Sequence, residues 1–186
     1  MASDEEIREK VRLGYEFHKH VAQLLLKRGF LEGQVSMRPP TPDDYRHKER
    51  LEELGKSHYS SPDIMVINSW MDGPKLQWKF GLLCSYRSRL WFDNGSSYVH
   101  VPEYQAKDYA NIQQEKGTVL YWAVGLGESP VTCEIRFIEV TAKWELFTVN
   151  GFRKAGFDWS QAMTTKDFIV HRLMKGDIEL KHSVMA

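Results

Sequence analysis

The sequence has few cysteines, no net charge and no long apolar run. Two cysteines among 186 residues exclude a disulfide framework and lack the paired spacing of a structural zinc site. The 25 basic and 25 acidic side chains cancel, so any contact with nucleic acid must come from a local patch. No segment approaches the ~20 apolar residues of a membrane helix, and the acidic N-terminus lacks the apolar core of a signal peptide. We therefore expect a cytoplasmic protein without membrane association.

The order of the expected elements predicts an α/β fold. The length suits one domain, so we expect residues 1–186 to form a single domain with a central mixed sheet flanked by helices, in which the aromatic-rich C-terminal third extends the same domain. Hydrophobic periodicity predicts helices over 4–28, 102–116 and 165–175. It also predicts strands over 32–37, 63–68, 76–86, 118–124 and 133–140. Between these elements we expect a charged helix or loop over 43–55, a turn over 71–74 and a polar loop over 93–97. The strands over 63–68 and 76–86 would pair as an antiparallel hairpin.

An aspartate opens a strand whose composition predicts burial. Pro62 and Asp63 precede the apolar run 64–67, and a carboxylate at such a place can hold a hard cation. The following strand ends in the sequence Tyr86-Arg87-Ser88. A Gly14-x-x-Phe17 pattern opens the first helix, and a helix–strand unit covers 104–127.

In order and spacing these features resemble the PD-(D/E)XK restriction-endonuclease-like superfamily, especially its small archaeal-resolvase-like and Mrr-like members. The resemblance covers residues 14–127 and implies a restriction-endonuclease-like fold. It also implies a nuclease site in which an aspartate and a second acidic residue bind magnesium and a lysine activates water. Phosphodiester hydrolysis needs such groups because the phosphate charge must be neutralised and the nucleophile must be hydroxide-like.

Carried over residue by residue, the catalytic pattern is incomplete. Asp63 matches the first carboxylate, but the acidic position falls on Leu83 and the lysine position on Ser85. The auxiliary glutamate of the first helix falls on His18. Leucine cannot ligate a metal and serine carries no cation, so Asp63, joined at most by the Cys84 carbonyl, would hold magnesium weakly. We therefore expect no resident cofactor and a noncatalytic nuclease-fold domain, with a degenerate active site, that binds nucleic acid or a protein partner through a vestigial cleft.

A second candidate catalytic set lies on the same predicted strand. Gln77 and Lys79 form a Gln-x-Lys triplet, and strand alternation puts them on the face of Leu83 and Ser85. If the chain is an active magnesium-dependent DNA endonuclease, its catalytic residues would be Asp63, Gln77 and Lys79. Lys79 and Ser85 lie ~20 Å apart along a strand, so only one register can meet Asp63, and a tight turn favours the one with Leu83.

Several other polar side chains would line the expected cleft: His18, Ser85, Arg87, Arg89, Gln105 and Tyr109. Arg87 and Arg89 could hold phosphates bidentately, or they are solvated charges at a strand end. His18 is a metal ligand or a packed, hydrogen-bonded histidine. Gln105 and Tyr109 point into the cleft, or they pack on the sheet at helical spacing.

A structural or oligomeric interaction protein is the third hypothesis. Six tryptophans and the aromatic C-terminal third would supply apolar contact surface. The candidate partners are therefore DNA, RNA, another protein or a second copy of this chain. Binding to nucleic acid with steep salt dependence distinguishes the first hypothesis from the third, and metal-dependent cleavage identifies the second.

Overall fold

The structure is a computed structural model that describes residues 3–30, 34–41, 62–67, 78–140, 144–149 and 151–178. The predicted charged segment 43–55 and the predicted turn 71–74 lie outside these residues, as does Gln77.

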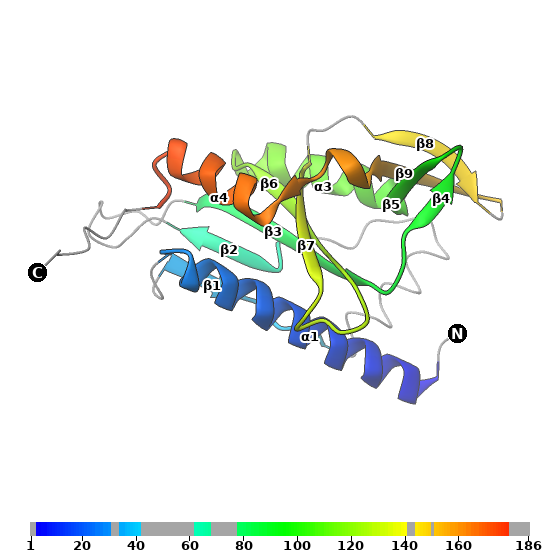
Figure 1. Cartoon of the computed structure of the whole chain (residues 1–186), viewed down its shortest axis with the longest axis horizontal. Coiled ribbons are helices and arrows are strands. Elements are labelled where there is room, and N and C mark those ends of the chain that lie inside the picture. The colour runs from blue at the N-terminus through cyan, green and yellow to red at the C-terminus, as the bar shows by residue number, and fades with distance from the viewer. Residues whose placement is uncertain are drawn as a thin grey trace, which may run out of the picture.

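A mixed six-stranded sheet forms the centre of the molecule (Figure 1). Its strands, in spatial order, are β1 (Val35–Met37), β2 (Ile64–Ile67), β3 (Trp78–Arg87), β6 (Leu120–Leu126), β7 (Glu134–Glu139) and β10 (Met163–Thr164). β3 and β6 are parallel, and the other neighbours are antiparallel. The predicted hairpin pairing of β2 with β3 is confirmed, and β3 lies inside the sheet with a neighbour on each side.

Helices cover both faces of this sheet. They are α1 (Asp4–Lys27), α3 (Glu103–Lys116) and α4 (Thr165–Met174), with a short 3₁₀ turn, η3, over Trp159–Gln161. α1 begins at a capping box, in which the Ser3 side chain accepts a hydrogen bond from the Glu6 N–H and the Glu6 carboxylate accepts one from the Ser3 N–H. No helix in the described part of the chain is long and apolar enough to cross a membrane.

A second sheet of four strands packs beside α3, with which it shares a hydrophobic cluster. Its order is β4 (Trp91–Asp93), β5 (Ser96–Pro102), β9 (Phe152–Asp158) and β8 (Glu145–Val149), all antiparallel, and it lies at one end of the molecule (Figure 1). The polar loop predicted over 93–97 is shorter than expected: only residues 94 and 95 form the turn of the β4–β5 hairpin, and the other three residues belong to its strands. Asn94 and Gly95 both have positive φ, 45° and 83°, as a two-residue hairpin turn of this kind requires.

The strand β3 separates two hydrophobic clusters. Phe80 and Leu82 face the α1 side, where they pack with residues such as Phe17 and Phe168. Leu83 faces the α3 side. The α3-side cluster also holds Trp122 of β6, Tyr109 and Ile112 of α3, and Val99 and Ala155 of the second sheet. This arrangement confirms the predicted α/β domain with a central mixed sheet between helices.

One close approach makes a glycine necessary in β6. A Cβ added at Gly125 would lie 2.3 Å from Phe17 Cε2 and 2.7 Å from Cys133 Sγ. Phe17 is fully buried against the sheet, so its ring has no free space into which to move.

We expect Gly125→Ala to lower the free energy of unfolding by about 1–3 kcal/mol, the usual cost of overpacking a core. Urea denaturation followed by tryptophan fluorescence measures this change. Thr148→Ala, at an exposed position of β8, is the control and should change stability by less than about 0.5 kcal/mol. Equal stability of the two variants would show that α1 does not pack tightly over Gly125.

Candidate functional site

Asp63 lies immediately before β2, and the β2–β3 register decides which residues are near it. Ile64 pairs with Leu82, and the Asp63 N–H donates to the Leu82 carbonyl at 2.9 Å. The Asp63 Oδ2 atom accepts a hydrogen bond of 2.7 Å from the Cys84 N–H. Residues 82–84 of β3, and not Lys79, therefore lie beside Asp63.

His18 reaches the same place from α1. Its side chain is buried, and its Nε2 atom lies 4.0 Å from Asp63 Oδ2. The other ring nitrogen, Nδ1, lies 3.4 Å from the Arg38 carbonyl oxygen. His18 therefore bridges the region before β2 and the segment after β1.

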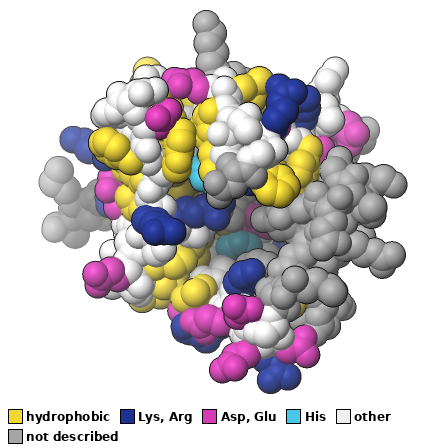
Figure 2. Space-filling view, turned by 90° about the vertical axis from the view of Figure 1, so that its right-hand side faces the viewer, with side chains coloured by type: hydrophobic (Ala, Val, Ile, Leu, Met, Phe, Trp, Pro, Cys, Tyr) yellow, Lys and Arg dark blue, Asp and Glu magenta, His cyan; other side chains and the backbone are white. Residues whose placement is uncertain are grey.

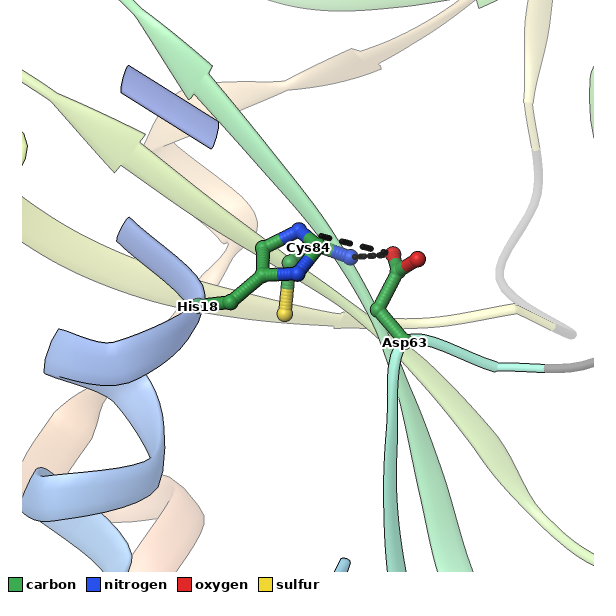
Figure 3. A group of neighbouring side chains, drawn as sticks. All are labelled: His18, Asp63 and Cys84. Atoms are coloured by element: carbon green, nitrogen blue, oxygen red, sulfur yellow. Dashed lines mark hydrogen bonds and ion pairs between the residues drawn. The ribbon is translucent and has the colours of Figure 1, made fainter. Parts of the chain in front are cut away.

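The thiol of Cys84 completes this group. One ligand atom from each of His18, Asp63 and Cys84 lies within 4.8 Å of the others (Figure 3). Burial raises the pKa of the Cys84 thiol well above its usual range, and the nearby Asp63 carboxylate raises it further. The thiol is not among the residues that the sequence predicts for the site, although strand alternation puts it on the face opposite Leu83 and Ser85, toward α1.

Leu83 and Ser85, at the positions of the resemblance's acidic residue and lysine, face α3. Leu83 is 1% exposed within the α3-side cluster. Ser85 has the same parity, and its Oγ atom is buried without a hydrogen-bond partner among the described residues. Neither side chain can offer Asp63 a carboxylate or an ammonium group. The nearby potential ligands in the described residues are an imidazole and a thiol, so the group does not fit magnesium, which prefers oxygen ligands.

Lys79 is at the opposite end of the β2–β3 pair from Asp63. Its neighbour Trp78 pairs with Ile67, the last residue of β2. The Lys79 ammonium group donates to the Asp177 carbonyl oxygen at 3.3 Å. The side chain of Asp177 is in turn 3.0 Å from the guanidinium of Arg172 in α4, so Lys79 lies near an ion pair at the carboxyl end of that helix. Gln77 lies outside the described residues.

Gln105 and Tyr109 are buried on the sheet side of α3. The Gln105 amide donates to the Tyr109 hydroxyl at 2.7 Å, and the Tyr109 ring packs in the α3-side cluster. Both residues therefore contribute to the packing of α3 on the sheet.

Basic side chains gather beyond the carboxyl end of β3. Arg87 is the last residue of this strand and is half-buried, whereas Arg89 is exposed. The pKa of His100 in β5 is lowered, first by burial and then by the charges of Arg87 and Lys154, so these two cations lie near it. Figure 2 shows this end of the molecule, where several Lys and Arg side chains border part of a hollow in which histidine is visible. His100 and Lys154 are not among the residues predicted for the site.

We expect Asp63→Ala to lower the free energy of unfolding by about 1–3 kcal/mol, because the Cys84 N–H then loses its acceptor within the sheet. Asp63→Asn keeps an acceptor oxygen and should recover most of this loss. Thermal and urea denaturation of the three proteins measure the difference. Indistinguishable stabilities of wild type and Asp63→Ala would show that this hydrogen bond contributes nothing to folding.

Comparison with known proteins shows the fold. The sequence matches no model of a protein family, and a search of curated proteins finds no relative. Among solved structures, the chain is similar to Hjc of Archaeoglobus fulgidus, a Holliday junction resolvase from an archaeal hyperthermophile. The two share 15% sequence identity with a TM-score of 0.51, and the match covers 84% of this chain and 99% of the resolvase. At this identity the likeness establishes a resolvase-like, restriction-endonuclease-like fold, which confirms the fold predicted from the sequence.

Proposed function

We propose that this chain is a nuclease-fold domain that binds nucleic acid, and DNA in particular, without cleaving it by a magnesium-dependent mechanism. The surroundings of Asp63 are the observation that carries this proposal. An imidazole and a thiol are its neighbours, while Leu83 is part of the core. Among the described residues, those beside Asp63 include neither a second carboxylate nor a lysine, and these groups are what would place a hydrated magnesium ion at a phosphodiester.

The proposed binding surface is the basic region beyond the end of β3. Arg87 and Lys154 are close enough to His100 for their charges to act on its pKa, and Arg89 is exposed next to them along the chain. Guanidinium groups suit phosphate oxygens because their donors form a planar fork. Since the whole chain has no net charge, such a local cluster is needed to attract a phosphate backbone.

Exposed apolar side chains on the second sheet support a protein-binding role less strongly than the basic region supports nucleic-acid binding. Phe92, Leu146 and Phe152 are 68%, 57% and 69% exposed. Strand pairing puts Phe92 and Leu146 on the face of Val99 and Ala155, and Phe152 on the opposite face with Lys154. These three residues therefore do not form one apolar surface, and singly exposed apolar residues are usual.

Cleavage and binding are tested with labelled single- and double-stranded DNA and RNA in the presence of magnesium or manganese. We expect no cleavage by wild type. Cleavage that is lost in Asp63→Ala would overturn the noncatalytic part of the proposal and revive a displaced catalytic set.

We expect DNA binding whose affinity falls with salt and which Arg87→Ala weakens. Removal of one phosphate contact should reduce the slope of log affinity against log salt by about 0.9 for duplex DNA. Arg28→Ala removes an exposed arginine after the carboxyl end of α1, away from β3's carboxyl end (Figure 1), and should leave the slope unchanged. Absence of binding, or equal effects of the two variants, would contradict the proposed surface.

A further inference from the structure

We propose that His18, Asp63 and Cys84 bind a divalent cation of intermediate softness, such as Zn²⁺ or Co²⁺. The three residues come from α1, from the residue before β2 and from the middle of β3, so the fold and not a sequence motif brings them together (Figure 3). Their ligand atoms lie within 4.8 Å of one another. This inference does not depend on nucleic-acid binding.

The three ligand atoms, which lie within 4.8 Å of one another, would have to move closer together to bind a metal. Zinc bonds of about 2.0–2.3 Å in tetrahedral geometry separate neighbouring ligand atoms by about 3.3–3.7 Å. His18 Nε2 and Asp63 Oδ2 are 4.0 Å apart, so this pair needs to approach by about half an ångström. Three protein ligands leave the fourth tetrahedral position for water or another ligand.

The hydrogen bond of the His18 ring sets which nitrogen can bind the cation. A carbonyl oxygen only accepts, so the contact of 3.4 Å with the Arg38 carbonyl places a proton on Nδ1. In the neutral ring, Nε2 then directs its lone pair toward the Asp63 carboxylate. A backbone carbonyl on the remote nitrogen is also the usual support of a metal-bound histidine.

A second hydrogen bond orients the carboxylate. The Cys84 N–H donates to Asp63 Oδ2 at 2.7 Å, so Cys84 supports one ligand through its backbone and provides another through its side chain. Hydrogen bonds of this kind fix ligating carboxylates in metal sites. His18 is 5% exposed and the Asp63 side chain is 20% exposed, so a cation would enter past Asp63.

The ligand set distinguishes between metals. One sulfur, one nitrogen and one carboxylate oxygen suit zinc, cobalt or ferrous iron, whereas magnesium requires oxygen ligands. Cation binding displaces the thiol proton, so the thiolate would be the sulfur ligand.

Cobalt titration of the purified full chain, first stripped with a chelator, tests the proposal. We expect visible absorption of four-coordinate Co²⁺ with a thiolate charge-transfer band, which Zn²⁺ abolishes by competition and excess Mg²⁺ does not. Cys84→Ser should remove the charge-transfer band and weaken binding by more than about 100-fold, since it removes a ligand itself, where loss of a supporting residue costs 10–100-fold. Cys133→Ser, at the other half-buried free cysteine, is the matched control and should keep the spectrum.

Two further measurements keep the test decisive if Cys84→Ser fails to fold. His18→Gln should retain the fold and lose the four-coordinate spectrum. Zn²⁺ should raise the melting temperature of wild type and of Cys133→Ser, because a ligand that binds only the native state stabilises it. Absence of a cobalt spectrum in wild type, or a spectrum that persists in His18→Gln or is lost in Cys133→Ser, would overturn the proposal. Nucleic-acid binding is measured separately, in the presence of a chelator that removes any bound metal. A failure of the proposed nucleic-acid binding can therefore be told apart from a failure of the proposed metal site.

Discussion

The register between β2 and β3 is the constraint on which the candidate site depends. Because Ile64 pairs with Leu82, Asp63 falls beside residues 82–84, and its carboxylate can reach the Cys84 N–H. A slip of one residue would exchange the two faces of the strand. It would then place Phe80 and Leu82 on the α3 side and remove the thiol from His18. The buried apolar residues on both faces of β3 therefore fix the site as well as the core.

The same strand carries the argument for the proposed noncatalytic role. In β3 the positions of the acidic residue and the lysine, Leu83 and Ser85, face the layer of α3 and the second sheet. Leu83 stabilises that layer by apolar burial, which a carboxylate could not do without a partner. The intermediate position, Cys84, faces α1 and brings a thiol to Asp63. One face of β3 thus supplies packing at these two positions, while the other face brings a different set of possible ligands to Asp63.

Much of the fold could be predicted from the sequence, and the site only in part. Three elements have a clear local pattern in the sequence and lie close to their predicted ranges. These patterns are the helical periodicity of apolar residues along α1, the apolar run of β6 and the Pro62–Asp63 pair before β2. The second sheet escaped prediction because its strands are short and mostly half-exposed, and their pairing joins residues 91–102 to residues 145–158. No local pattern records such contacts. Asp63 and His18 could be identified by resemblance, whereas the proximity of His100 to Arg87 and Lys154 depends on that distant strand pairing.

The charges of the ligands indicate that the proposed metal binding and the proposed nucleic-acid binding are independent of each other. A divalent cation bound by the Asp63 carboxylate and a Cys84 thiolate would have its charge cancelled by these two ligands, with His18 neutral. A neutral group is tolerated in a partly buried place where an isolated charge is not, so the ligand set suits the burial of the site. For the same reason such a cation would attract phosphate weakly over distance. Attraction of a nucleic-acid backbone would then come from Arg87 at the end of β3 and from Lys154 of β9, and the metal would act through the stability of the α1–β2–β3 junction.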